Sequence, residues 1–297
     1  VYMLGVGHDL APIRDSFTET KPHVAFNLLV HFHGVAVYDQ HVVSYMELLK
    51  KPYTGCNPRG LLLARDKALS KELMSLHRIR VPKSHVFPRG RKTRRPRKLE
   101  FPLLVKSVAE EASLGISQTS VVTNDQKLAE RVEFMHETFN VDVIAEEYID
   151  GRELYVGVLG NHRLQTLPVW ELPLDQLPDG APRIATAKVK WDLDYQQKYE
   201  IETHRADIPK ELEQEIGKLA KRIHRVLGLT GYVRIDLRLA PDGKVYVLEA
   251  NPNPDLKVSE DFAESAKAEG IPYPDLLQRI LNLGMSYPAE WKKNEAV

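Results

Sequence analysis

Two neighbouring runs in the C-terminal third of the chain alternate between apolar and polar residues. The runs are 231–239 (GYVRIDLRL) and 244–251 (KVYVLEAN), and both are rich in β-branched and aromatic side chains. The sequence Pro-Asp-Gly at 241–243 has the composition of a turn. Alternation with a period of two on both sides of a turn predicts a β-hairpin.

Polar groups on this hairpin predict a metal site. Side chains on a strand point alternately to opposite faces, so Arg234 and Asp236 share one face and Glu249 and Asn251 share one face of the partner strand. If the loop holds an even number of residues, Asp236 lies opposite Val247. Asp236 and Glu249 are then diagonal neighbours about 7 Å apart. Carboxylate and amide oxygens suit Mg²⁺; the alternative is a solvated strand face with one Arg–Glu pair.

Strand-like and helix-like segments alternate at the N-terminus. The pattern predicts strands at 1–7 and 21–30 and helices at 11–19 and 40–50. Such alternation favours a small parallel α/β domain. No glycine-rich first βα turn occurs in it, so we expect the domain 1–80 to lack its first strand.

The middle of the chain contains longer periodic segments. Apolar residues recur with helical spacing at 61–77 and 209–227, and apolar runs at 101–106 and 143–149 predict buried strands. A polar segment with several prolines follows at 171–203. A loop of this length inside a compact chain is functional or disordered.

Composition limits the classes of partner. The 297 residues are 43% hydrophobic, and Lys+Arg and Asp+Glu are equal at 41 each. A balanced charge gives no overall field toward nucleic acid or membrane surfaces, and no apolar run approaches the ~18 residues of a membrane span. No signal peptide is visible. The lone Cys56 excludes an internal disulfide, so we expect a cytoplasmic protein without nucleic-acid or membrane partners.

A basic run occupies 88–98 (PRGRKTRRPRK). It contains Pro and Gly and lacks interleaved aromatic residues. We interpret it as a solvated linker loop. The alternative is a contact with an RNA backbone, which would show as strongly salt-dependent affinity.

Candidate phosphate-binding groups follow the first buried strand. Lys106 ends that strand, and small residues at 110–117 could wrap phosphate oxygens with their backbone N–H groups. The second buried strand ends in the acidic sequence 146–149, and Glu153 lies just beyond it. The segment 171–203 adds further lysines.

The order of these motifs resembles the ATP-grasp superfamily and, within it, the D-alanine–D-alanine ligase branch. The resemblance spans roughly residues 27–283. It implies an α/β (α+β ATP-grasp) fold with a small N-terminal parallel α/β domain and two lobes that sandwich ATP. The expected divisions are 1–80, 81–150 for the central lobe, and 151–297 for the C-terminal lobe with the metal site.

The resemblance implies roles for the residues that match the family motifs. Lys67 and Lys106 hold ATP phosphates, and Lys198 reaches the γ-phosphate from the long loop. Ser113 and Gly115 cap the phosphates. Lys106 and Lys198 are thereby catalytic as well as nucleotide-binding candidates.

The remaining roles concern the nucleoside and the metal. Glu153 binds the ribose, and Arg234 stabilises the oxyanion at the acyl carbon. The adenine edge meets the hinge that consists of Glu146, Glu147, Tyr148 and Ile149. Two Mg²⁺ ions, or Mn²⁺, bind to Asp236, Glu249 and Asn251.

The activity implied is ATP-dependent ligation of a carboxylate to an amine through an acyl phosphate. The expected partners are small-molecule substrates such as amino acids or peptides, and a homodimer is among the expected assemblies. A true D-alanine–D-alanine ligase and a non-catalytic nucleotide-binding module are the alternatives.

Departures from the family concern the substrate positions. Where the D-alanine enzymes carry a Ser-Leu pair for the second amino acid's carboxylate, this chain has Glu260 and Asp261, and the serine expected in the phosphate loop is Ala112. Two carboxylates repel a substrate carboxylate and attract an amine. We therefore expect substrates other than two D-alanines.

Overall fold

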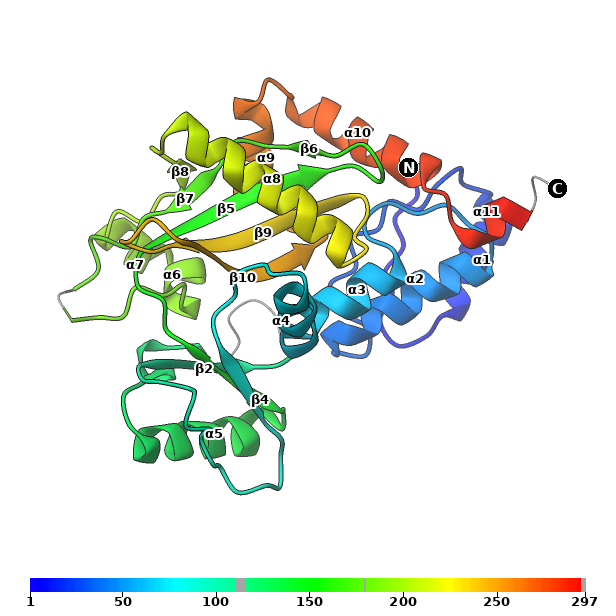
Figure 1. The fold of residues 1–297 in the computed structure, drawn as a ribbon. Coiled ribbons are helices and arrows are strands. Elements are labelled where there is room, and N and C mark those ends of the chain that lie inside the picture. The colour runs from blue at the N-terminus through cyan, green and yellow to red at the C-terminus, as the bar shows by residue number, and fades with distance from the viewer. Residues whose placement is uncertain (110–115, 179, 295–297) are drawn as a thin grey trace.

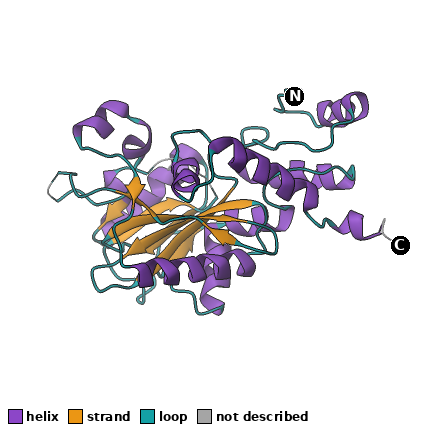
Figure 2. Cartoon of the chain, turned by 90° about the horizontal axis from the view of Figure 1, so that it is seen from above, coloured by secondary structure: helices purple, strands orange, loops and turns teal. Residues whose placement is uncertain are grey.

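Two antiparallel sheets covered by helices make up the fold (Figure 1 and Figure 2). The computed structural model describes residues 1–109, 116–178 and 180–294. Ser113 and Gly115 lie outside the described residues. The mixture of helices and antiparallel strands is an α+β arrangement, as the sequence predicts.

The smaller sheet has the strand order β1-β4-β2-β3. Its strands are β1 (Ser84–Phe87), β2 (Leu103–Ser107), β3 (Val121–Val122) and β4 (Val143–Glu147). Helix α5 (Asp125–Phe139) begins at Asn124, whose side chain accepts a hydrogen bond from the Lys127 N–H, and it buries an apolar stripe against this sheet. The two predicted buried strands are confirmed apart from their ends.

The larger sheet has the order β10-β9-β5-β7-β8, and β6 pairs with β5. Its strands are β5 (Arg152–Leu159), β6 (Gln165–Thr166), β7 (Trp170–Leu172), β8 (His204–Arg205), β9 (Tyr232–Leu239) and β10 (Val245–Pro252). Helix α8 (Lys210–Val226) crosses β5 and packs on the apolar face of the sheet. The predicted helix at 209–227 is thus confirmed.

The opposite face of the larger sheet carries the polar residues. Tyr155 and Gly157 of β5 lie directly across from Asp236 and Arg234 of β9. Helix α9 (Asp261–Ala268) contacts β5 on this side. The two faces of one sheet therefore separate the apolar core from the candidate chemistry.

Other helices complete the chain. They are η1 (Ala36–Tyr38), η2 (Gln118–Ser120), α10 (Tyr273–Ser286) and α11 (Glu290–Asn294). No helix among the described residues is long and apolar enough to span a membrane.

The N-terminal strands predicted at 1–7 and 21–30 are wrong, although helices α1 (Ala11–Thr20) and α2 (Asp39–Leu48) form close to the predicted places. In the described part of this region, parallel pairing is limited to one bridge between Ala25 and Tyr53. An apolar run becomes a strand only where a neighbouring backbone pairs with it. A regular parallel sheet is therefore absent from the described N-terminal residues.

The helix predicted at 61–77 is two helices, α3 (Pro58–Arg65) and α4 (Lys67–Leu76). The break lies at Asp66, whose backbone is extended and whose carboxylate accepts hydrogen bonds from Ala68 N and Leu69 N at 2.9 Å. Asp66 is thus an N-cap that starts a new helix. As a result, Lys67 occupies the first turn of α4.

The hairpin register differs from the predicted one. Leu239 pairs with Val245, so the loop between them, 240–244, holds an odd number of residues. A β-bulge between Val247 and Glu249 then shifts the pairing by one residue. The bulge brings Glu249 directly opposite Asp236, where the sequence placed them diagonally. The predicted convergence on one face is confirmed, and its cause is the bulge rather than the loop length.

The segment 171–203 is not a continuous loop. It contains the end of β7 and two short helices, α6 (Ala187–Trp191) and α7 (Leu193–Lys198). The basic run 88–98 is a loop between β1 and β2, as predicted.

Candidate active site

Five charged residues from four elements meet at one end of the larger sheet. The Lys106 ammonium of β2 lies 2.9 Å from Oε1 of Glu146 on β4, and Lys71 of α4 lies 3.4 Å from the same oxygen. The Lys67 ammonium lies 3.9 Å from Oε2 of Glu249 on β10. We call these residues the lysine cluster (Lys67, Lys71, Lys106, Glu146 and Glu249). All three lysines are buried, so their charges depend on these partners.

The cluster shifts the pKa values of its members. Burial acts to raise the pKa of the Glu249 carboxyl, but the ammonium groups of Lys67 and Lys106 outweigh it and lower that pKa well below its usual range. Burial lowers the pKa of Lys71 to about 8, against the opposing effect of Glu146. Burial also acts to lower the pKa of Lys106, yet Glu146 and Glu249 raise it overall. Lys106 is thus held charged at neutral pH.

Lys71 was missed by the sequence prediction. Its ammonium also donates a hydrogen bond to the Leu248 carbonyl, at the bulge of β10. One side chain therefore joins α4, the smaller sheet through Glu146, and the larger sheet through Leu248. Its spacing from Lys67, one helical turn along α4, is the sequence signal that could have revealed it.

The three predicted metal ligands lie on one face of the hairpin. Glu249 pairs directly with Asp236, and Asn251 pairs with Arg234. Nδ2 of Asn251 is buried and has no hydrogen-bond partner among the described residues, so this NH₂ group can still donate a hydrogen bond to a ligand oxygen. Among all the described residues, no three or more His, Cys, Asp or Glu side chains lie close enough together to hold a metal ion. Two carboxylates and an amide oxygen are still a donor set that fits Mg²⁺.

Arg234 extends between two carboxylates on this face. It donates to both oxygens of Asp236, at 2.8 and 2.9 Å, and to Oδ2 of Asp261 at 3.4 Å. Its guanidinium lies 4.5 Å from the centre of the Tyr155 ring. Although burial acts to lower the pKa of Arg234, Asp236 raises it well above the usual value.

Glu153, the predicted ribose ligand, is engaged inside the protein. Its carboxylate accepts hydrogen bonds from Arg238 at 2.7 Å and from the Tyr155 hydroxyl at 3.0 Å. It is 5% exposed. A ribose contact therefore requires sharing this carboxylate with Arg238.

The predicted adenine hinge divides into an inner and an outer part. The Glu146 side chain points into the lysine cluster, whereas Glu147 pairs with the exposed Lys83 at 2.9 Å. Tyr148 donates its backbone N–H to Pro102 O. Among the described residues, the N–H of Ile149 has no hydrogen-bond partner. The outer part thus retains one donor for a base.

Lys198 is not brought to the cluster. It is exposed on α7, and its ammonium lies 5.1 Å from the ring centre of Tyr199. The lysine of this segment that lies near the metal candidates is Lys190 of α6. Burial raises the pKa of the Asp236 carboxyl, and the charge of Lys190 opposes that rise together with Arg234. The same charge adds to those of Lys67 and Lys106, which lower the pKa of Glu249. Thr186 is the N-cap of α6, and a threonine at this position is the sequence signal that could have revealed the helix that carries Lys190.

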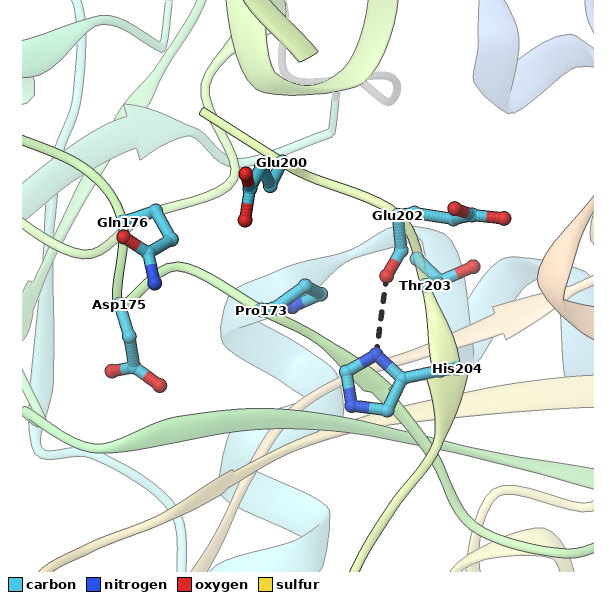
Figure 3. A pocket seen from close by; sticks show the side chains of 7 residues that line it. All are labelled: Pro173, Asp175, Gln176, Glu200, Glu202, Thr203 and His204. Atoms are coloured by element: carbon cyan, nitrogen blue, oxygen red, sulfur yellow. Dashed lines mark hydrogen bonds between the residues drawn. The ribbon is translucent and has the colours of Figure 1, made fainter. Parts of the chain in front are cut away.

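A cavity at the other end of the 171–203 segment's loops lies apart from these residues. It has a volume of about 550 Å³, and Figure 3 shows its polar side chains around an open space. The lining residues are Pro173, Asp175, Gln176, Glu200, Glu202, Thr203 and His204. None of them is a residue that the sequence assigned to ATP or metal.

Comparison with known proteins identifies the family. Residues 76–282 match the family described as D-ala D-ala ligase C-terminus. A D-alanine–D-alanine ligase of Desulfotalea psychrophila is 31% identical over 264 residues, which cover 88% of this chain and 78% of that protein. The chain belongs to the D-alanine–D-alanine ligase family. The predicted resemblance is thereby confirmed, and this family member is an ATP-dependent ligase.

Solved structures support the same assignment of fold. The VanG D-Ala:D-Ser ligase of Enterococcus faecalis is 26% identical and has a TM-score of 0.71, covering 88% of this chain and 73% of that one. A D-alanine–D-alanine ligase of Bacillus anthracis complexed with ATP has a TM-score of 0.73 at 23% identity, covering 95% and 84%. The latter likeness shows the fold alone. The predicted ATP-grasp fold is confirmed.

Proposed function

We propose that this ligase joins a carboxylate to an amine through an acyl phosphate, with ATP as the phosphoryl donor. The observation that carries the proposal is the lysine cluster beside the Asp236–Glu249 pair, with Arg234 next along the same sheet face. Phosphoryl transfer needs cations around the phosphates, and acyl transfer needs a cation at the carbonyl oxygen. Both are available on one surface.

The reaction balances without an enzyme nucleophile. A donor carboxylate oxygen attacks the γ-phosphorus, the bond to the β-phosphate oxygen breaks, and ADP leaves. The lone pair of the deprotonated amine then attacks the acyl carbon, and the C–O bond to phosphate breaks. Of the two protons that the ammonium loses, one leaves with phosphate and one goes to solvent.

We propose positions for the nucleotide that the geometry supports. Lys67 and Lys106 bind phosphates, and Lys190 takes the role that the sequence gave to Lys198, because Lys190 lies nearer to the carboxylate pair. The free N–H of Ile149 meets the adenine, and Glu153 meets the ribose. Ser113 and Gly115 remain proposed phosphate contacts.

The proposed metal ligands are Asp236, Glu249 and Asn251, for two Mg²⁺ ions or for Mn²⁺. A bound metal supplies neutralisation of charge on the transferring phosphoryl group. Arg234 lies beside the pair, where it is suited to stabilise the oxyanion at the acyl carbon. Its bidentate bond to Asp236 fixes the guanidinium in that position.

We further propose that the substrates are not two D-alanines. Asp261, which stands where the D-alanine enzymes have an uncharged side chain, lies 3.4 Å from Arg234. A carboxylate there disfavours a second amino acid that carries its own carboxylate. The second candidate is a D-alanine–D-alanine ligase, which is the printed function of the Desulfotalea psychrophila relative.

The test is ADP release with Mg²⁺-ATP across D- and L-amino acids, dipeptides and polyamines. We expect release that needs one carboxylate and one amine, and Arg234→Ala should lower kcat by about 10²- to 10³-fold. Arg279→Ala is the matched control, because Arg279 is an exposed arginine of α10 bonded to Gln165. Release with D-alanine alone would favour the second candidate, and ATP binding without ADP release on any pair would reject ligation.

A further inference from the structure

The loop between β1 and β2 concentrates positive charge. Its residues 88–98, which we call the basic loop, contain seven of the chain's 41 basic residues and no acidic residue. The rest of the chain therefore carries 34 basic against 41 acidic side chains. The balanced total, from which we expected no nucleic-acid partner, thus conceals a positive loop on an otherwise acidic protein.

Two arginines fasten the basic loop to the two ends of α5. Arg89 donates a hydrogen bond to Oδ1 of Asn140, the C-cap residue of α5. Arg95 donates to Oδ1 of Asp125, the first residue of α5, at 2.7 Å. These two attachments are 15 residues apart along the helix, or about 22 Å at 1.5 Å per residue. The loop therefore follows α5 along its length, at the outer edge of the molecule (Figure 1).

The other five cations of the basic loop have no carboxylate partner. All five side chains are exposed, and within the described part of the chain they form no ion pair. They are Arg91, Lys92, Arg94, Arg97 and Lys98. The exposed glutamates of α5 do not pair with them. Five like charges within eight residues repel one another, so a polyanion that neutralises them gains free energy on binding.

The basic loop and the lysine cluster lie on opposite sides of the smaller sheet. Val105 and Ala145 pack into the apolar core beneath α5, and so does Leu99, which directly follows the loop. Lys106 and Glu146, the next residues along the two strands, point to the other face, because side chains alternate along a strand. A ligand on the basic loop therefore leaves the proposed ATP site open.

The composition of the basic loop favours one kind of polyanion. The run contains no Trp, Phe, Tyr, Leu or Ile, so it lacks an apolar anchor for a membrane surface and an apolar centre for a protein interface. It also lacks aromatic rings on which unpaired bases could stack. The phosphate backbone of a duplex needs none of these, since it binds through charge alone.

We propose that the basic loop binds the phosphate backbone of a duplex nucleic acid without sequence preference. Three of the five unpaired cations are arginines, whose planar guanidinium donates two hydrogen bonds to one phosphate. A duplex presents one negative charge per ~1.7 Å of its axis, so a loop that extends along α5 meets enough phosphates for all five. Such contacts fix position and carry no sequence information.

The test is fluorescence anisotropy with labelled RNA and DNA duplexes of about 20 base pairs and one sequence. We expect a Kd of about 10⁻⁶–10⁻⁵ M at about 50 mM KCl, and a slope of log K against log[KCl] near −4 for five contacts. Saturating Mg²⁺-ATP should not displace either duplex, because the lysine cluster lies on the other face. The duplex that binds more tightly identifies the source of the phosphates.

A triple variant tests the loop directly. Arg91→Gln, Lys92→Gln and Arg94→Gln together should weaken duplex binding at least tenfold at the lower salt concentration and reduce the magnitude of the salt slope by about 2–3. ADP release should match that of the wild type, because none of these residues belongs to the proposed active site. The proposed function and the duplex binding can therefore fail separately.

The matched control removes three exposed cations from α8. Lys210→Gln, Lys218→Gln and Arg225→Gln change the net charge by the same amount, and duplex affinity should stay within about twofold of the wild type, apart from the general effect of net charge. If thermal unfolding shows that the first triple variant is not folded, the double variant Arg97→Gln with Lys98→Gln replaces it. The double variant should reduce the magnitude of the salt slope by about 2.

Several results would overturn the inference. They are an unchanged salt slope in the loop variants, equal losses in the control variant, or no binding of either duplex at the lower salt concentration. Displacement of the duplexes by Mg²⁺-ATP would place them in the lysine cluster instead. Tighter binding to single strands, to vesicles that contain phosphatidylserine or to polyglutamate would assign the charge to another partner.

Discussion

The lysine cluster and the group formed by Arg234, Asp236 and Asp261 are neighbours but have opposite charge balance. The lysine cluster has three ammonium groups for two carboxylates, whereas the group around Arg234 has one guanidinium for the carboxylates of Asp236 and Asp261. Both regions are buried, so their charges are weakly screened by solvent. An uncompensated charge in such a place costs free energy unless a ligand of opposite sign completes it. The lysine cluster is therefore suited to an anion, whereas the group around Arg234 is not.

The largest expected effect comes from removing one ammonium group, that of Lys106, from the lysine cluster. Lys106→Met leaves Glu146 with Lys71 as its remaining close ammonium partner, and it removes one of the proposed phosphate contacts. We expect kcat/KM for ATP to fall by about 10²- to 10³-fold, because a buried charge aimed at the reacting group is lost. Steady-state ADP release measures the change.

The control for this prediction is Lys83→Met. Lys83 also pairs with a glutamate of the same strand end, Glu147, but its side chain is 65% exposed. Exposed ion pairs contribute little, so its kcat/KM should change less than about twofold. A similar small change in Lys106→Met would show that the cluster is structural.

The second prediction concerns the region around Arg234, which lies opposite Gly157. Gly157→Ala places a methyl group against Leu167 and Phe262. Displacing α9 should raise KM for the amine about tenfold and lower the free energy of unfolding by about 1–3 kcal/mol. KM for ATP should stay the same, because the lysine cluster is built from other elements.

Urea unfolding and initial rates at varied amine concentration measure these two effects. Gly5→Ala is the matched control, since a Cβ at Gly5 meets no atom within 4 Å. Equal rises in both KM values would mean that the two regions are not separable.

The smallest expected effect is a dependence on pH of the free energy of unfolding and of KM for ATP. Burial lowers the pKa of Lys71 to about 8 from 10.5, so the folded protein binds fewer protons than the unfolded chain between these pH values. The free energy of unfolding should therefore rise with pH across that window owing to this group, by at most about 1.4 kcal/mol per pH unit. Over the same window KM for ATP should rise two- to threefold, as the ammonium loses its charge.

Lys71→Met should reduce both slopes, and burial of Lys67, which also lowers its pKa, leaves the remainder. Urea unfolding and ADP release at pH 7, 8, 9 and 10 provide the comparison. The exposed Lys267, which pairs with Glu264, gives the control variant Lys267→Met, whose profiles should follow the wild type. Identical profiles for Lys71→Met and wild type would contradict the role given to Lys71.

Sequence pattern was sufficient for the parts of the site that lie on regular elements. Alternation predicted that Arg234 and Asp236 share one face, and the apolar run 101–106 predicted the buried strand that contains Lys106. These predictions use only the side-chain period of a strand, which holds wherever the strand forms.

Other parts depend on tertiary contacts that no local pattern contains. An aspartate such as Asp66 can lie inside a helix or cap the start of a new one. Its hydrogen bonds from Ala68 N and Leu69 N show that it caps α4. The sequence does not distinguish Lys190 from Lys198, because both lie in the same polar segment. The packing of α6 brings Lys190 toward Glu249. The ion pair of Asp261 with Arg234 likewise requires α9 to fold back on the sheet.

The bulge in β10 has a consequence for how the chain tolerates changes in length. Deleting Leu248 would leave Glu249 directly after Val247, so an unbroken ladder would still pair it with Asp236 on the same face. An insertion or deletion elsewhere in the strand would instead turn one carboxylate into the apolar core. A one-residue deletion that keeps both carboxylates on the same face is therefore one that removes the bulge residue Leu248. What such a deletion would lose is the carbonyl that holds Lys71.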